Sequence, residues 1–167
     1  MIDGEEEEER FATVRFGSLL PESIELPSRT LQQLSGDNRL ADAGVMPSGL
    51  QRRVAVAWTT EMAEMTCAHV RVLVGQQFGL PWLAAGVATF VLLHPRAETE
   101  LYPGDLTAMA LSAHAALLEF APTETKAMLQ ADFNWMEQTY AFDDSRELLR
   151  GAQENLRRAR RLAGLLN

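Results

Sequence analysis

The stretch "PWLAAGVATFVLLHP" (residues 81–95) decides the fold class of this chain. Its apolar run extends from Trp82 to Leu93, and a proline stands at each end of the stretch. The run is shorter than the ~20 residues that a membrane-spanning helix needs, and its length is typical of a buried core helix. A helix that is apolar on every side is surrounded by other elements. We therefore predict the central helix of a soluble bundle here, with membrane insertion as the alternative.

The longest predicted helix precedes this core segment. Its apolar residues follow three- and four-residue spacing from Leu50 to Val72 and form one stripe. Ser48 suits the N-cap, and Gly79 suits the position after the last turn, where a left-handed residue ends many helices. The large apolar residues of segment 52–58 also alternate, which leaves a strand as the alternative for that part. The continuous phase of the stripe favours one helix over residues 48–78.

The N-terminal part of the chain is predicted to be less regular. Residues 11–16 ("FATVRF") alternate in polarity and indicate an extended arm or a short strand. Residues 29–34 ("RTLQQL") indicate a short helix capped by Ser28. Residues 1–10 hold six acids and one arginine, a charge of −5, and are predicted to be a flexible acidic tail. The helical domain is therefore expected to cover residues 11–167.

Three more helices are predicted downstream. Asp105 is placed as the N-cap of a helix over residues 106–120, Pro122 begins a helix that reaches about Tyr140, and "FDDS" (residues 142–145) caps the last helix. A chain of 167 residues can bury a core without disulfides. Cys67 is the only cysteine, and we expect it to be a small buried apolar residue. The predicted fold is a single-domain, all-α bundle of about six helices with an extended N-terminal arm.

The last predicted helix has two distinct faces. An apolar seam with three- and four-residue spacing is formed by Leu149, Ala152, Leu156, Ala159, Ala163 and Leu166. At ~100° per residue, the other side carries Arg146, Arg150, Arg157 and Arg161. Residues 146–161 contain six arginines and two glutamates, a charge of +4 in a chain of net charge −8. We predict that the seam faces the core and that the arginines face solvent.

These faces favour a function in protein binding. Arginine forms bidentate pairs with carboxylates, so the arginines suit an acidic protein surface or the acidic tail of a second copy. Phe133 and Trp135 point to different faces, so we expect one of these two aromatic rings to lie near the surface. We therefore add Trp135 to the predicted partner-binding residues. We expect a non-enzymatic interaction or assembly protein. Its predicted partner-binding residues are Arg146, Arg150, Arg157, Arg161, Leu149, Leu156, Trp135, Glu5, Glu6 and Glu7.

Other interpretations of the arginines remain open. They can form a solvated face that complements the negative end of the helix dipole. Binding to nucleic acid or to an anionic membrane surface is disfavoured, because the chain is acidic and no aromatic residues lie among the arginines. A further alternative within protein binding is an acidic inhibitor or immunity-type protein that neutralises a basic partner.

The sequence offers no motif for catalysis, cofactors or metal. His69, His94 and His114 lie on separate segments, and neither a Glu-x-x-His nor a His-Glu-x-x-His motif occurs. Cys67 and His69 would point about 200° apart on a helix, so they cannot form a nucleophile–base pair. We expect no cofactor and no metal; a small metal-dependent or hydrolytic enzyme using the three histidines is the alternative. No targeting segment is recognisable, so a cytoplasmic location is expected.

Overall fold

The computed structural model of the chain describes residues 10–41 and 48–166. These residues form nine α-helices and three short 3-10 helices, and pairing between their extended segments is limited to isolated bridges. The helices share one hydrophobic core. The predicted single-domain, all-α fold is therefore confirmed, with nine helices in place of about six. Most of the predicted acidic tail, including Glu5, Glu6 and Glu7, lies outside the described residues.

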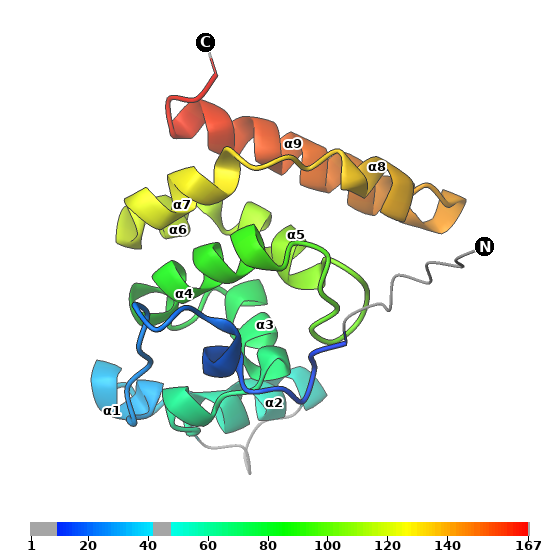
Figure 1. Cartoon of the computed structure of the whole chain (residues 1–167). Helices are drawn as coiled ribbons and strands as arrows, with labels where there is room; N and C mark the ends of the chain where they lie inside the picture. Colours follow the sequence, from blue (N-terminus) through cyan, green and yellow to red (C-terminus); the bar gives the residue numbers. More distant parts are fainter. Residues whose placement is uncertain (1–9, 42–47, 167) are drawn as a thin grey trace, which may run out of the picture.

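The helices are stacked in layers (Figure 1). In chain order they are α1 (Leu31–Ser35), α2 (Gly49–Trp58), α3 (Cys67–Gly75), α4 (Leu80–Leu93), α5 (Asp105–Ser112), α6 (His114–Phe120), α7 (Pro122–Leu129), α8 (Trp135–Thr139) and α9 (Arg146–Leu162). α1 and α2 form one end of the stack, and α3, α4 and α5 form its middle. α6 and α7 follow, and α9 lies across the other end beside α8.

α4 is the central helix, as predicted. It packs against α3, α5, α6 and α7, and most of its apolar side chains are buried. It is not enclosed on every side, because Trp82, Leu92 and Leu93 are exposed. Only the bent pair α3–α4, counted together, has the length and apolar composition to cross a membrane; no single described helix does.

Gly79 lies at the start of α4 and not in the position predicted for it after α3. Its φ is +73°, and a Cβ atom there would lie 2.7 Å from Leu31 Cδ1, so both conformation and packing require glycine. The left-handed residue that follows α3 is Gln77, with a φ of 57°.

The predicted helix over residues 48–78 is wrong, because the chain bends between α2 and α3. Residues 52–58 are helical, which excludes the strand alternative. A 3-10 turn (Met62–Glu64) follows, and Thr66 then caps α3 in a capping box with His69. The bend is held by the N-terminal arm: Phe16 N–H donates to Met65 O and Cys67 N–H to Val14 O, both at 2.9 Å. Backbone groups that a continuous helix would pair internally are thus paired with a distant segment.

The two following helices are also split. The predicted helix 106–120 breaks at Ala113 into α5 and α6, and the helix predicted to reach Tyr140 ends at Leu129. Before α8, the backbone N–H of Asn134 donates to Asp132 Oδ1 at 2.7 Å, a turn that competes with helix. Asp105 is the first residue of α5 and not its N-cap.

The N-terminal arm is non-helical up to Phe16, where a 3-10 turn (Phe16–Leu19) begins. It is not extended throughout, because the Val14 N–H donates to Phe11 O at 2.9 Å and closes a turn at residues 12–13, and the predicted strand is absent. Isolated bridges join Arg10 to Glu98 and Arg15 to Thr66. The short helix α1 is also confirmed, but its cap is Thr30 and not Ser28.

Candidate functional site

The predicted partner-binding helix, α9, lies across α5, α6 and α7. Leu156 is buried together with the two alanines beside it, and Leu149 packs partly buried against the core. The predicted inward direction of the apolar seam is therefore confirmed. Leu166 is the exception, because α9 ends at Leu162 and Leu166 is exposed beyond it.

The opposite side of α9 carries the arginine face, by which we mean Arg146, Arg150, Arg157 and Arg161. All four side chains are exposed. Arg146 and Arg150 each lie 3.0 Å from an acidic neighbour on the same segment, Asp143 and Glu147, and all four groups in these pairs are at least 76% exposed. Exposed pairs of this kind contribute little to stability. Among the described residues, the guanidinium groups of Arg157 and Arg161 have neither a hydrogen-bond partner nor an ion-pair partner.

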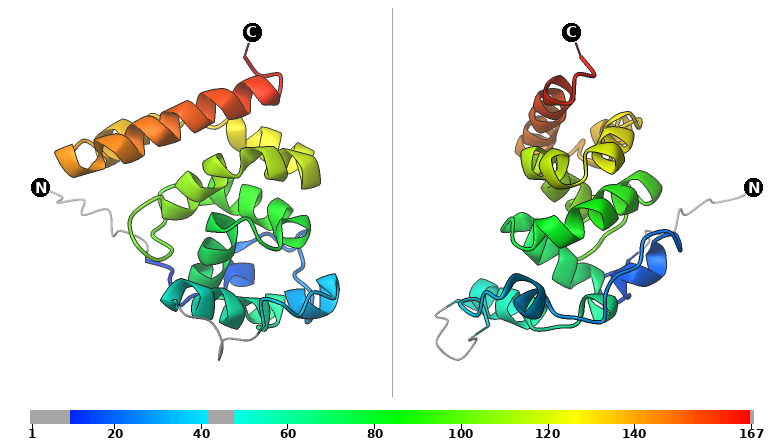
Figure 2. Two further views of the ribbon diagram at one scale, coloured as in Figure 1. Left: turned by 180° about the vertical axis from the view of Figure 1, so that it is seen from behind. Right: turned by 90° about the vertical axis from the view of Figure 1, so that its left-hand side faces the viewer.

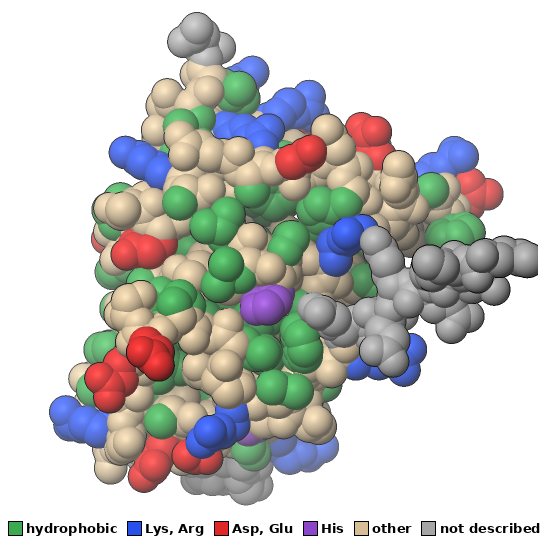
Figure 3. All heavy atoms as spheres, in the orientation of Figure 1, with side chains coloured by type: hydrophobic (Ala, Val, Ile, Leu, Met, Phe, Trp, Pro, Cys, Tyr) green, Lys and Arg blue, Asp and Glu red, His purple; other side chains and the backbone are tan. Residues whose placement is uncertain are grey.

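The arginine face is open to approach from outside. Figure 2 shows the N-terminal half of α9 projecting beyond the stacked helices. Figure 3 shows basic side chains along the edge of the molecule formed by α9, with acidic side chains between them. The surface is therefore basic with interspersed acids, which is more typical of a protein contact than of a uniform phosphate-binding surface.

Arg160 belongs to the same helix but has a structural role that sequence reasoning missed. Its Nε donates to Leu129 O at 2.9 Å, and its Nη2 donates to Ala131 O at 3.0 Å. Its guanidinium also lies 5.7 Å from the ring centroid of Phe133. Arg160 thus satisfies carbonyls after α7 that the broken helix leaves without intrahelical partners. Its position near the edge of the seam is the signal that separates it from the arginine face.

The two aromatic rings near α8 differ in burial, as predicted. Phe133 is buried and Trp135 is partly exposed. Trp135 is also part of the internal packing, since its ring centroid lies 6.0 Å from that of Tyr140. The more exposed aromatic is Phe142, at 73%, which sequence reasoning did not single out.

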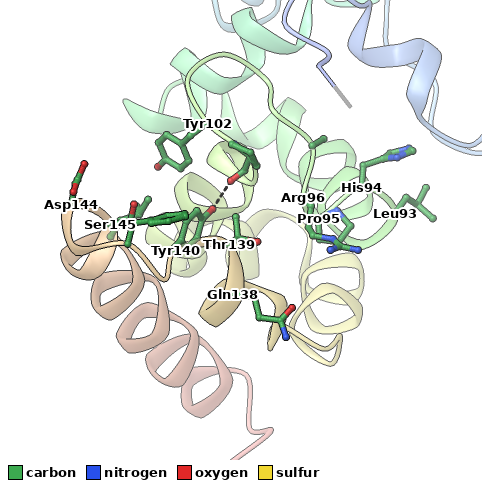
Figure 4. Close-up of a pocket in the computed structure, with 14 residues that line it drawn as sticks. Leu93, His94, Pro95, Arg96, Tyr102, Gln138, Thr139, Tyr140, Asp144 and Ser145 are labelled. Carbon is green, nitrogen blue, oxygen red and sulfur yellow. Dashed lines mark hydrogen bonds between the residues drawn. The ribbon is translucent and has the colours of Figure 1, made fainter. Parts of the chain in front are cut away.

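A pocket of about 1170 Å³ lies between the segment after α4 and the corner that joins α8 to α9. Tyr140 Oη donates to Pro103 O at 2.6 Å on its wall (Figure 4). Burial raises the pKa of both Tyr102 and Tyr140, so neither phenol serves as a base near neutral pH. Figure 4 shows His94 at the opposite end from Asp144 and Ser145, so these three side chains do not form a catalytic group.

The three histidines lie on separate elements and have local roles. His69 Nδ1 accepts from the Thr66 backbone N–H at 3.2 Å, and His114 Nδ1 lies 2.7 Å from Leu111 O. The ring of His94 lies 5.2 Å from that of Phe90. Within residues 10–41 and 48–166, no three or more histidine, cysteine or acidic side chains are grouped so that they could hold a metal ion.

Cys67 is fully buried, as predicted. Burial, with a smaller effect of the Asp105 carboxylate, raises the pKa of its thiol to about 12. The thiol is therefore protonated and enclosed at neutral pH, which removes the two properties of a reactive cysteine.

Near Cys67 lies a buried charge cluster, by which we mean Asp105, Arg71, Glu100 and Arg53. The sequence did not reveal it. Asp105 is fully buried, and its carboxylate accepts hydrogen bonds from Thr99 N at 2.8 Å and Thr99 Oγ1 at 2.6 Å. Arg71 Nε lies 3.8 Å from Asp105 Oδ2, and Arg71 Nη1 lies 3.8 Å from Glu100 Oε2. Glu100 also forms an ion pair with Arg53. The cluster joins the loop before α5 to both α2 and α3.

No protein-family model matches this chain, and comparison with curated proteins and with solved structures also produced no match.

Proposed function

We propose that this chain is a non-enzymatic helical domain that binds an acidic protein surface through the arginine face of α9. The observation that supports the proposal is the row of four exposed arginines on a helix that packs through its other side. Arg157 and Arg161 support it most, because they have no acidic partner among the described residues. The fold does not need the arginine face for packing, so the face is free for another molecule.

The chemistry of arginine matches this partner. Its planar guanidinium presents paired donors to a carboxylate, and it is less strongly hydrated than a lysine ammonium. Arg146 and Arg150 can exchange their exposed intrahelical pairs for intermolecular ones at little cost. The seam residues Leu149 and Leu156 position the helix on the core, and the proposal assigns them no direct contact with the partner.

The chain itself contains one acidic segment of the required chemistry. Residues 5–9 are five consecutive glutamates, and Glu5, Glu6 and Glu7 are the ones we assign to binding. A second copy is therefore one source of the partner surface, and a different acidic protein is the other. We further propose a reducing compartment such as the cytoplasm, since the chain has a single cysteine.

The test uses a fluorescein-labelled peptide with the sequence of residues 1–10. It is titrated into full-length chain in which Glu5–Glu9 are replaced by glutamine, so that the chain's own tail does not compete. We expect a rise in fluorescence anisotropy at low salt that is lost at high salt. Arg157→Gln with Arg161→Gln should weaken binding by about fivefold, the effect of two exposed charge pairs.

The control has the same change in net charge at two other exposed arginines, Arg29→Gln with Arg158→Gln. It should bind the peptide nearly as well as the parent chain. Equal weakening by both double variants would mean that only net charge matters, and the proposal would be wrong. Binding of a DNA duplex in place of the peptide would instead assign the arginine face to nucleic acid.

A further inference from the structure

A second pocket lies at the other end of the molecule from α9. It has a volume of about 760 Å³ and is lined by residues of the N-terminal arm, α2, α3 and Glu100. This volume lies within the range of about 300–1000 Å³ that is typical of small-molecule sites. The arginine face contributes none of its residues.

The wall of this pocket is mainly apolar. Val56 on α2 and Val72 on α3 contribute to it, together with Ala68 and with Ala12 of the arm. Val56 is 50% exposed although it lies within a helix whose neighbouring alanines are buried. Its side chain therefore has apolar surface that the fold leaves open to the pocket.

The charged groups of the pocket are two arginines and one glutamate, Arg52, Arg53 and Glu100. Arg52 is exposed, and its guanidinium has no hydrogen-bond or ion-pair partner among the described residues. Arg53 is paired with Glu100, and Glu100 also lies 3.8 Å from the Arg71 guanidinium, so the charge of this carboxylate is compensated. The uncompensated charge at the pocket is therefore the guanidinium of Arg52.

His69 is the remaining titratable residue of the lining. Its Nδ1 accepts the Thr66 backbone N–H, so the proton of the neutral ring is on Nε2. Burial lowers the pKa of His69, which keeps the ring neutral at physiological pH. The lining thus includes a neutral imidazole whose proton is on Nε2.

We propose that this pocket binds a small amphipathic carboxylate, with its apolar chain against Val56 and Val72 and its anionic head beside Arg52. A mainly apolar lining that includes one unpaired guanidinium and a neutral imidazole is complementary to that ligand chemistry. A cationic ligand would meet Arg52 and Arg53 without a free carboxylate. A fully polar ligand would leave the apolar wall uncovered.

The test is isothermal titration calorimetry of full-length chain with decanoate as the probe. We expect saturable binding of one decanoate per chain. Decanol, which has the same chain without the charge, should bind at least about tenfold more weakly, because a charge-assisted hydrogen bond is lost. Equal binding of decanol would overturn the proposal, and so would the absence of saturable decanoate binding.

Two variants locate the binding. Arg52→Gln should weaken decanoate binding by about tenfold, and Val56→Asp should abolish it by placing a negative charge on the apolar wall. Both residues are exposed, so both variants should keep the helical circular dichroism of the parent chain. Arg29→Gln removes an exposed arginine far from the pocket in sequence and should leave binding unchanged.

Binding that persists unchanged in Arg52→Gln and Val56→Asp would assign decanoate to another site and overturn the proposal. The result does not depend on the arginine face. Arg157→Gln with Arg161→Gln should leave decanoate binding intact, so failure of one proposal is distinguishable from failure of the other.

Discussion

At the scale of the residue, Gly104 is the described glycine whose added Cβ atom would meet the closest neighbours. Its φ is +76°, and a Cβ atom there would lie 2.5 Å from Trp135 Cη2 and 2.6 Å from Tyr140 Oη. Any side chain would both strain the backbone and displace two aromatic rings. Trp135 and Tyr140 thus depend on a glycine that lies about thirty residues earlier in the chain.

We predict that Gly104→Ala lowers the free energy of unfolding by about 2–4 kcal/mol, the sum of left-handed strain and overpacking. Urea denaturation followed by circular dichroism measures the change. Gly36→Ala is the matched control, since Gly36 has a φ of +70° with nothing within 4 Å of the added Cβ. It should cost only about 1 kcal/mol. Equal losses in the two variants would show that the contacts of Gly104 add nothing to its conformational strain.

Cys67 supplies a second prediction at this scale. The raised pKa of its thiol, about 12 against the ordinary 9.0, means that the folded state favours the protonated form. The corresponding stability is present below the ordinary pKa and is lost as the pH rises toward the folded value. Because the folded thiol is buried and protonated, we expect a thiol reagent at mildly alkaline pH to react with Cys67 only when the protein unfolds around it. The labelling rate should then equal the rate of this opening. Labelling of folded chain at the rate found in urea would contradict this burial.

At the scale of the element, α9 is held by more than its apolar seam. Arg160 ties it to the end of α7 through two carbonyl oxygens. We predict that Arg160→Gln lowers the free energy of unfolding by about 1–3 kcal/mol, because two part-buried carbonyls lose a charged donor. Arg158→Gln, which removes only an exposed pair with Glu154, should change it by less than about 0.5 kcal/mol. Chemical denaturation of both variants tests this, and equal effects would refute the role of Arg160.

The individual helices can be predicted from the sequence to different degrees. The apolar run of α4 and the prolines that bound it are sufficient to predict this helix, because these signals are local. The inward seam of α9 is also local, since three- and four-residue spacing places its residues on one side. The helices predicted over residues 48–78, 106–120 and 122–140 are each broken in the structure. The sequence does not show these breaks, because the apolar periodicity continues across them. At the end of α2, the hydroxyls of Thr59 and Thr60 donate to the carbonyls of Ala55 and Val56, a bond that threonine also makes inside helices, so these residues do not mark the break.

At the scale of the whole molecule, sequence reasoning could not assemble the sites that combine several elements. The arginine face lies on one helix, so helical spacing alone is enough to group its four residues. The second pocket takes residues from the arm, α2, α3 and the loop before α5, which no periodicity connects. The buried charge cluster is similar: Arg71 and Asp105 pair across the core, and only the packing of α3 against α5 brings them together.

The pairing of the arm with the bend between α2 and α3 has a kinetic consequence. Local pattern favours one continuous helix over this region, whereas the folded chain requires a corner held by residues 12–16. The arm can hold the corner only after a loop of roughly fifty residues has closed, which costs entropy before any contact is gained. We therefore expect the continuous helix to compete with the native corner early in folding. Docking of the arm then converts the continuous helix into the bend between α2 and α3. We expect this conversion to be the slow step of folding.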